Sequence, residues 1–385
     1  MKILQIIKTN NGAGWAFRQI SSLLKIANDI EIVVMLPNDV EGFAEKYKEI
    51  GVQVIPFDPS ISKKNLLSFK RVKKEFIEII EQIKPDLIHC HFVTNIIFVR
   101  LALRKINIPR IFQIPGPLHL ESFLTRKIEI LTADKNDYWV GSCHKTNEIY
   151  KKEGISSRRL FFATYSAPYD ENYQVPKKNN QFRKKYQVAD DDFLISMVCY
   201  FYKPKKYLLK FKGIKGHEDF INAISVVEKK YPNVKAMIIG GIAPGAEKYA
   251  NKIIKYANKK CKNIIFTGHQ ENILDIYPNI DLAIHPSRSE NYGGCVESLL
   301  NLVPTITSDA GGFPELIKEG KTGYLFKKGD YKELAEKIEY VICNYEKAKK
   351  TTIEGQKVAL SFNPTASAKQ IYIPYERIMK VTKGK

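Results

Sequence analysis

DLAIHPSRSENYGGCVESLLNLVPTITSDAGGFPELI, spanning residues 281–317, is the stretch that decides the fold. Its pattern predicts a strand, a loop, a helix, a second strand and a glycine-rich turn leading into another helix. Strands that alternate with helices in this way are typical of parallel sheets, which bind ligands at the carboxyl ends of their strands. Gly293 and Gly294 permit close backbone approach, and the helix after them offers unpaired N–H groups and a positive dipole end. The stretch therefore predicts a site for an anion such as a diphosphate.

The same alternation runs through the rest of the chain. In the first half the apolar runs are ILQII, IEIVVML, VQVIPF, DLIHC, RIFQI, YWVGS and LFFATY, and in the second half they are FLISMV, KAMIIGG, NIIFTG, DLAIHP, PTITS and YLF. The polar segment 169–180 between the halves contains a proline and lacks apolar periodicity, which is typical of an interdomain linker. Because 385 residues exceed the size at which one core stops growing, we expect two open α/β domains. A terminal helix over 364–382, kinked at Pro374, follows them.

The composition is that of an ordinary globular protein, with 44% apolar and 26% charged residues. Six widely spaced cysteines without a CxxC pair predict reduced, mostly buried thiols. The N-terminal MKILQII is shorter than a secretory apolar region, and no stretch approaches the roughly 18 apolar residues of a membrane span. We therefore expect a cytoplasmic protein.

The net charge of +20 raises the question of an anionic partner. The excess is spread over both halves, and no RNA-binding aromatic signature or helix-turn-helix pattern accompanies it, which argues against nucleic acid. The segment 62–83, SKKNLLSFKRVKKEFIEIIEQI, combines basic residues with apolar helical spacing. It fits a helix lying on anionic lipid, and it also fits an ordinary basic surface helix.

Two carboxylates flank the glycine pair: Glu290 precedes it and Glu297 lies on the helix after it. Carboxylates accept hydrogen bonds from sugar and ribose hydroxyls. Taken singly, Glu290 also fits a solvated loop charge, and Glu297 fits an acidic residue stabilised by the helix dipole.

Lys215 opens a helix in FKGIKGHEDFINAI, where a cation is unfavourable unless an anion lies nearby. A phosphate would supply that anion, although an exposed flexible lysine also fits. Upstream, the strand-end loop 200–206, YFYKPKK, is dense in aromatic residues and lysines. We expect it to gate the ligand site or to contact an acceptor or a membrane.

Candidates in the first half also lie at strand ends. Gly12 and Gly14 form a glycine loop after the first strand, but the loop lacks the third glycine of the dinucleotide fingerprint and the lysine of a P-loop. Dehydrogenase and P-loop functions are therefore disfavoured. His91 and His119 each follow a strand, where an imidazole can bind sugar hydroxyls or move protons, although single histidines are more often structural. His89, inside a strand, we interpret as structural.

Together these residues resemble the retaining family 4 glycosyltransferases of the GT-B architecture over nearly the whole chain. The resemblance covers the first glycine loop, PDLIHCH, the KG helix start, IIGG, IIFTGHQ, HPSRSENYGGCVESLL and GGFPELIKEGKTGYLF. It implies two Rossmann-like parallel-sheet domains with a cleft between them. Residues 1–170 would form the acceptor-side domain and 171–363 the nucleotide-sugar donor domain, and a helix within 364–385 would cross back to the first domain.

The resemblance also implies roles for single residues. Glu297 would hold the donor ribose and Glu290 would face the transferred sugar. Catalytic roles would fall to Glu290, Lys215, His91 and His119. Donor binding would fall to a partly overlapping set, namely Gly12, Gly14, Lys215, Asn291, Gly293, Gly294 and Glu297.

The sequence departs from the family pattern at two places. The family places seven residues between its two glutamates, but only six lie between Glu290 and Glu297, and the strictly spaced position is Ser289. The family's arginine after the first strand of the second domain is also absent. Three lysines of the 200–206 loop are candidates to replace it, as point charges in place of a bidentate fork: Lys203, Lys205 and Lys206.

The implied reaction moves a sugar from a nucleoside diphosphate sugar, with a UDP-sugar expected, to a saccharide or lipid-linked saccharide with retention at the anomeric carbon. Lys215 and helix N–H groups would stabilise the leaving diphosphate. The family needs no dedicated nucleophile and no metal, and no Asp-x-Asp motif lies near a strand end. Such enzymes assemble polysaccharides or glycolipids in the cytoplasm or at the inner face of the membrane. Two alternatives stay open: a nucleotide-sugar epimerase built in the same way, and a basic protein that binds membrane or nucleic acid.

Overall fold

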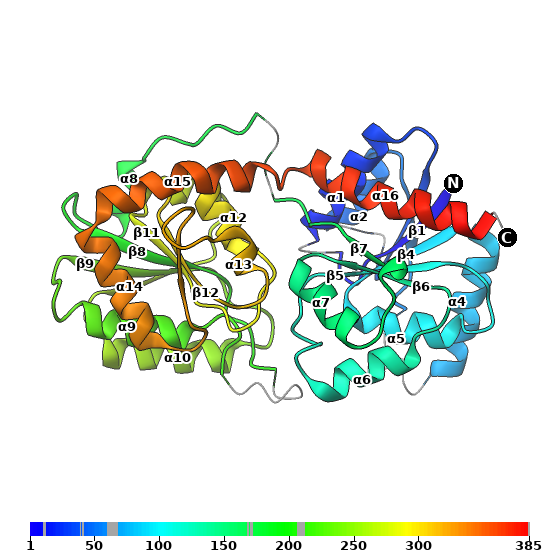
Figure 1. The fold of residues 1–385 in the computed structure, drawn as a ribbon, viewed down its shortest axis with the longest axis horizontal. Helices are drawn as coiled ribbons and strands as arrows, with labels where there is room; N and C mark the ends of the chain where they lie inside the picture. The colour runs from blue at the N-terminus through cyan, green and yellow to red at the C-terminus, as the bar shows by residue number, and fades with distance from the viewer. Residues whose placement is uncertain are drawn as a thin grey trace. The chain divides into compact units, whose positions relative to one another are not determined.

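The structure, a computed structural model, describes residues 1–10, 13–38, 40, 42–59, 68–167, 169, 172–205 and 212–383. The chain divides into two compact units (Figure 1). Unit 1 comprises Met1–Asp170 together with Phe362–Lys385, and unit 2 comprises Glu171–Ser361.

Unit 1 contains a parallel sheet of seven strands in the order β3-β2-β1-β4-β5-β6-β7. The strands are β1 (Lys2–Ile6), β2 (Glu31–Leu36), β3 (Gln53–Pro56), β4 (Leu87–His91), β5 (Arg110–Ile114), β6 (Asp137–Gly141) and β7 (Leu160–Phe162). The helices are α1 (Gly14–Ile26), α2 (Gly42–Glu49), α4 (Phe69–Ile83), α5 (Val93–Ala102), α6 (Phe123–Thr132), α7 (His144–Lys152) and α16 (Pro364–Lys383). Helices α1, α2 and α16 share an apolar core with one face of the sheet, and α4, α5 and α7 share one with the other face (Figure 1).

Unit 2 contains a parallel sheet of six strands in the order β10-β9-β8-β11-β12-β13. The strands are β8 (Phe193–Val198), β9 (Val234–Ile239), β10 (Ile264–Gly268), β11 (Leu282–His285), β12 (Thr305–Ser308) and β13 (Tyr324–Phe326). The helices are α8 (Asn180–Lys185), α9 (His217–Val227), α10 (Glu247–Lys260), α11 (Ile273–Ile276), α12 (Gly293–Leu300), α13 (Phe313–Leu316), α14 (Tyr331–Cys343) and α15 (Tyr345–Leu360). Helices α9, α10 and α14 pack on one face of the sheet, and α11 packs on the other.

The strands are nearly continuous apolar runs because helices cover both faces of each sheet. Every residue of β4, β5 and β11 is buried. In both sheets the strand order reverses beside the first strand, between β1 and β4 in unit 1 and between β8 and β11 in unit 2. Open α/β sheets bind ligands just beyond the carboxyl ends of the strands at such a reversal.

Helix α16 completes the core of unit 1. The Tyr375 hydroxyl accepts a hydrogen bond from Gln5 Nε2 at 2.9 Å and lies 2.5 Å from His89 Nδ1. Gln19 Nε2 donates to Ser367 Oγ at 2.9 Å. Buried polar groups need such partners, so these contacts fix the position of the helix on the sheet. They also give His89 the structural role that its place inside a strand predicts.

The predicted parallel strands are all present, although the run LFFATY forms a strand only over Leu160–Phe162. Helix α16 runs through Pro374 without ending there. The six cysteines form no disulfide in the described part of the chain, and Cys343 is exposed while the others are buried or half-buried. No described helix is long and apolar enough to cross a membrane.

Candidate active site

The strand reversal of unit 2 brings one cation and one carboxylate together. Strands β8 and β11 are paired, with Leu282 opposite Ile195. The chain beyond β8 reaches Lys215 just before α9, and the chain beyond β11 reaches Glu290 just before α12. The Lys215 ammonium and the Glu290 carboxylate form a hydrogen-bonded ion pair whose side chains are only 20% and 14% exposed. The anion that Lys215 requires at its helix start is therefore, in this structure, a carboxylate of the same unit.

The pair stays ionised at neutral pH. Burial raises the pKa of Glu290, but the Lys215 charge and hydrogen bonds from Lys215, Asn291 and Ser287 outweigh it and lower that pKa. Burial lowers the pKa of Lys215, and the Glu290 charge outweighs that effect and raises it. The Ser287 hydroxyl and the Asn291 N–H lie 3.2 and 3.1 Å from the carboxylate oxygens that they contact. Three donors thus fix the orientation of the carboxylate.

Two glycines allow the loops around this pair to touch through their backbones. Gly311 has φ +56°, and a Cβ atom there would lie 1.8 Å from the carbonyl oxygen of Glu290. Gly216 has φ +78°, and a Cβ atom there would lie 1.9 Å from the carbonyl oxygen of Pro286. A side chain at either position would displace the loop that carries Glu290, so only glycine fits.

A second ion pair joins the same two loops. The Arg288 guanidinium contacts the Asp219 carboxylate of α9 at 2.5 Å, and the Arg288 N–H donates to the Ile214 carbonyl at 2.7 Å. The Asp219 side chain is 3% exposed. The sequence analysis missed this pair, because the two residues are 69 positions apart and belong to no recognisable motif.

His285, the last residue of β11, contacts the start of α12. Its Nε2 lies 3.0 Å from Ser298 Oγ on α12, and Ser298 Oγ in turn accepts from Thr305 Oγ1 at 3.0 Å. Burial lowers the pKa of His285 to about 3, so the ring is neutral at physiological pH. A Cβ atom on Gly294 would lie 3.2 Å from this ring, which shows how closely the helix start approaches it. The sequence analysis missed His285 as well.

A small cavity of about 20 Å³ lies at this place, lined by Lys215, Glu290, His285, Ser287 and Gly294 among others. That volume accommodates about one water molecule.

Glu297 lies beyond the cavity on the next turn of α12 and is half-buried. The Tyr277 hydroxyl is within hydrogen-bonding distance of both the Gly294 carbonyl at 3.2 Å and Glu297 Oε2 at 3.3 Å. Tyr277 thus links Glu297 to the turn, a contact between positions 20 apart that no residue pattern predicts. Gly293, with φ +43°, is exposed at the start of the helix.

Ser289, at the family's strictly spaced position, and Glu290 beside it have different surroundings. Ser289 is 7% exposed, and its buried hydroxyl has no hydrogen-bond partner among the described residues. Glu290 points to Lys215 instead. Asn291 donates its N–H to Glu290, while its own side-chain oxygen is buried without a partner in the described part of the chain.

The contacts of the described residues do not show which lysine of the 200–206 loop takes the place of the family's arginine. Lys203 is exposed and Lys205 half-buried, and neither forms an ion pair with another described residue. Lys206 lies outside the described residues. The Tyr202 ring of the same loop lies 5.9 Å from Lys215 Nζ, so an aromatic face approaches the cation from this side.

In unit 1 the histidine candidates differ sharply. His91 is fully buried, and both its nitrogens have partners: Nδ1 lies 3.0 Å from the Tyr165 hydroxyl and Nε2 lies 2.9 Å from Gln5 Oε1. Burial lowers the pKa of His91 to about 3. His119 is 8% exposed, and its Nε2 lies 2.6 Å from Glu129 Oε2, while no described residue contacts its Nδ1 by a hydrogen bond.

The first glycine loop is described only in part. Gly14 is the first residue of α1, and a Cβ atom there would meet the Arg18 and Phe43 side chains at 3.0 and 3.2 Å. Gly12 lies outside the described residues.

Comparison with known proteins matches both units to glycosyltransferases. Residues 207–358 match the family described as glycosyl transferases group 1, and residues 2–120 match the family described as glycosyl transferase 4-like. EpsD of Bacillus subtilis, whose name describes it provisionally as a glycosyltransferase, is 23% identical over 87% of this chain and 85% of its own length. CapM of Staphylococcus aureus, a capsular polysaccharide biosynthesis glycosyltransferase, is 26% identical over 62% of this chain and 60% of its own.

Among solved structures, HepE of Anabaena in complex with UDP and glucose superposes with a TM-score of 0.77 and 19% identity, covering 98% of this chain and 99% of HepE. Two parallel-sheet, Rossmann-like units in this order define the GT-B fold. The chain belongs to the glycosyltransferases, with a glycosyl transferases group 1 domain in unit 2 and a glycosyl transferase 4-like domain in unit 1.

Proposed function

We propose that the protein is a retaining glycosyltransferase that moves a sugar from a nucleoside diphosphate sugar, most readily a UDP-sugar, to a hydroxyl of a saccharide or lipid-linked saccharide. The observation that carries the proposal is the Lys215–Glu290 ion pair at the strand reversal of unit 2, beside the N-terminus of α12. It combines a cation for a diphosphate with a carboxylate for a sugar hydroxyl. The UDP bound in HepE and the polysaccharide role in the name of CapM agree with this chemistry.

In the proposed reaction the bond between the anomeric carbon and the β-phosphate oxygen breaks. A bond between the same carbon and the acceptor oxygen forms on the same face, and the acceptor proton passes to the leaving phosphate. Lys215 and the N–H groups at the start of α12 stabilise the charge that grows on the diphosphate. Asn291, Gly293 and Gly294 complete that anion site.

Donor binding requires Lys215 to exchange partners. A diphosphate that reaches the α12 N-terminus competes with the Glu290 carboxylate for the ammonium. Glu290, once released, faces the transferred sugar and accepts hydrogen bonds from its hydroxyls. Glu297, on the next turn of the helix, accepts those of the ribose.

We assign the acceptor-side roles to unit 1. His119 keeps one ring nitrogen that no described residue occupies, so it is the histidine that contacts a sugar hydroxyl. His91, bonded at both nitrogens, supports the strand end beneath the site. Gly12 and Gly14 let the loop after β1 approach the donor closely.

We further propose that the protein works in the cytoplasm at the inner face of the membrane, in polysaccharide or glycolipid assembly. The described part of the segment 62–83, residues 68–83, turns its apolar face to the core, where Val72, Phe76 and Ile80 of α4 are buried. Its residues 62–67 lie outside the described part of the chain. Within residues 68–83, the exposed cations that could contact lipid are Lys70, Arg71 and Lys74.

Helix α6 presents the opposite arrangement and is the surface we assign to lipid. Its one buried side chain is the Glu129 carboxylate. Its exposed residues are all apolar, with Leu131 81% exposed, namely Phe123, Leu124, Ile128 and Leu131. Lys135 follows α6 closely in the chain, and Arg104 and Lys105 follow α5, whose Arg100 contacts Thr132 at the end of α6. All three cations are exposed, and none forms an ion pair with another described residue. Apolar side chains flanked by unpaired cations fit the surface of an anionic bilayer.

The test of the transferase proposal is donor binding followed by product analysis. UDP-, GDP- and ADP-sugars are screened for thermal stabilisation of the protein, and the best donor is then incubated with and without acceptor. We expect stabilisation by one donor class and its loss in both Lys215→Ala and Glu297→Ala. Unchanged stabilisation in both variants would refute the site, and rapid interconversion of the donor sugar without acceptor would identify an epimerase instead.

A further inference from the structure

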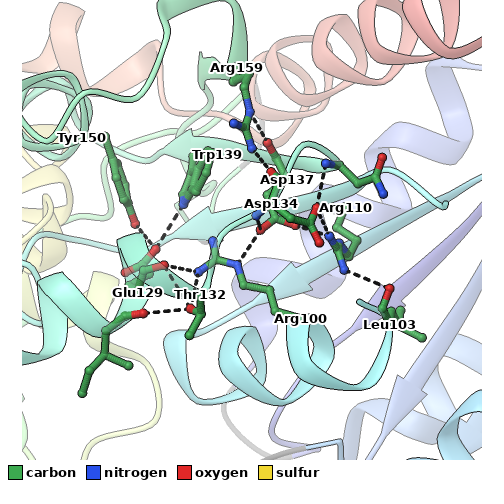
Figure 2. A network of polar contacts seen from close by, with 12 residues as sticks. Arg100, Leu103, Arg110, Glu129, Thr132, Asp134, Asp137, Trp139, Tyr150 and Arg159 are labelled. Carbon is green, nitrogen blue, oxygen red and sulfur yellow. Dashed lines mark hydrogen bonds and ion pairs between the residues drawn. The ribbon is translucent and has the colours of Figure 1, made fainter. Parts of the chain in front are cut away.

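A buried carboxylate in unit 1 binds the ring of His119. Glu129 of α6 is 1% exposed, and its side chain points inward to β6 and α7. The Tyr150 hydroxyl donates to Glu129 Oε1 at 2.6 Å and Trp139 Nε1 donates to the same oxygen at 3.1 Å (Figure 2). His119 Nε2 contacts the other oxygen, Oε2, at 2.6 Å.

The carboxylate is ionised and so acts only as an acceptor. Burial raises the pKa of Glu129, but the contact with His119, the Arg100 charge and the hydrogen bond from Tyr150 outweigh burial and lower the pKa to about 2. An ionised carboxylate has no proton to donate. The proton in the contact with His119 therefore belongs to the imidazole Nε2.

The carboxylate cannot turn to offer its other oxygen. Trp139 and Tyr150 are fully buried side chains of β6 and α7, and both donate to Oε1. Arg100 Nη1 donates to the Glu129 carbonyl at 2.7 Å, which fixes this turn of α6 (Figure 2). Oε2 is left for His119 alone.

Helix α6 also fixes the loop that carries His119. The Thr125 hydroxyl donates to the His119 carbonyl, and Arg126 Nη1 donates to the Leu120 carbonyl at 2.6 Å. The loop and the ring therefore have fixed positions relative to one helix. Nδ1 is the remaining polar atom of the ring, and no described residue forms a hydrogen bond with it.

We infer that Glu129 is a positioning residue for His119, which it holds as the Nε2–H tautomer so that Nδ1 accepts a hydrogen bond from a hydroxyl of the sugar ligand. The inference rests on the proposed function for the identity of the ligand. The tautomer itself depends only on the contacts of Glu129 and is measured without substrate.

The decisive variant is Glu129→Gln, which preserves shape but replaces one carboxylate oxygen by an amide NH2. Tyr150 and Trp139 both need an acceptor, so the amide oxygen takes the place of Oε1 and the NH2 group faces His119. The ring must then accept through Nε2 and carry its proton on Nδ1. Nitrogen NMR of the imidazole at pH 8.5, assigned with a His119→Gln sample, should show protonated Nε2 in the wild type and protonated Nδ1 in Glu129→Gln.

The same tautomer in both proteins, or a wild-type ring protonated on both nitrogens, overturns the inference. With substrates, Glu129→Gln should lower kcat about tenfold or more. Stabilisation by UDP, which we assign to unit 2, should not change. Glu153→Gln is the matched control, because Glu153 contacts α6 through Arg126 and Lys127 at 2.9 and 2.8 Å without touching His119.

A second pair of variants tests the inference if Glu129→Gln does not fold. In His119→Asn the side-chain oxygen can take the place of Nδ1 as an acceptor. In His119→Gln the longer side chain puts its amide group near the place of Nε2 instead. We expect His119→Asn to be about tenfold more active than His119→Gln. The reverse order would show that Nε2 is the working atom and would overturn the inference. A wild type that neither binds nucleotide sugars nor transfers sugar would refute the proposed function alone and leave the NMR result standing.

Discussion

Lys215 and Glu290 are each other's ion-pair partner in the described structure, although they lie 75 positions apart and follow different strands. Each residue thereby keeps the other charged inside a largely buried site. Removing one of them leaves the other as an uncompensated buried charge. The two single variants should consequently have different effects on nucleotide binding and on transfer.

Glu290→Gln should bind UDP at least as tightly as the wild type but transfer sugar at least about 100-fold more slowly. The substitution removes the charge that competes with a diphosphate for Lys215, and it also removes the carboxylate that faces the sugar. Calorimetry with UDP and a transfer assay measure the two effects separately. A variant that loses UDP affinity would contradict the exchange of partners. Lys252→Ala, at an exposed position of α10, serves as the charge control.

Gly311→Ala should unfold or distort unit 2. Its Cβ atom would lie 1.8 Å from the Glu290 carbonyl oxygen, in a backbone conformation with φ +56°. Gly320→Ala has a similar φ of +67° with nothing within 4 Å of the new atom, so it should cost only about 1 kcal/mol. Denaturant unfolding of both variants isolates the effect of the backbone contact. Similar losses of unfolding free energy in the two would show that the positive φ alone is responsible.

The stability of unit 2 should fall as the pH is lowered from about 6.5. Burial lowers the pKa of His217 and of His285 to about 3, whereas an unfolded histidine titrates near 6.5. Between these values the unfolded chain binds protons that the folded chain does not, so each histidine contributes up to about 1.4 kcal/mol of lost stability per pH unit. His285→Gln should reduce the slope of unfolding free energy against pH by one proton, and an unchanged slope would refute the assignment.

The apolar face of α6 should determine binding to lipid. Leu124→Ser combined with Leu131→Ser should abolish sedimentation with vesicles of phosphatidylcholine and phosphatidylglycerol, because it removes side chains that are 64% and 81% exposed. Ile353→Ser, at an apolar side chain 57% exposed on α15, is the matched control. Failure of the wild type to bind such vesicles, or equal binding to pure phosphatidylcholine, would end the lipid proposal in its anionic form.

Much of the fold was predictable because its signals are local. Apolar runs separated by helical patterns locate the parallel strands, and the block around Gly293 and Gly294 correctly predicts a helix start at a strand end. Lys215 could also be singled out, since a cation at a helix start is unfavourable without a partner. That its partner is Glu290 could not be read from spacing.

The remainder of the site depends on contacts between distant positions. Residue patterns do not encode the polar contacts that join separate parts of the site. Examples are the contacts of Arg288 with Asp219, His285 with Ser298 and Tyr277 with Glu297. The difference between His91 and His119 is of the same kind, because it depends on what faces each ring nitrogen. The apolar spacing of α4 left lipid contact and an ordinary surface helix both open, because a helix with one face packed into the core has the same periodicity.

The placement of α16 has a consequence for how the chain is made. Its residues Ala368, Ile371, Tyr375 and Ile378 belong to the core of unit 1, which otherwise consists of the first 170 residues. During synthesis those first residues leave the ribosome before α16 has been translated. The apolar surface that α16 covers therefore stays exposed while the whole of unit 2 is made. We therefore expect nascent chains that stop before residue 362 to hold a protease-resistant unit 2 and a first unit that recruits chaperones.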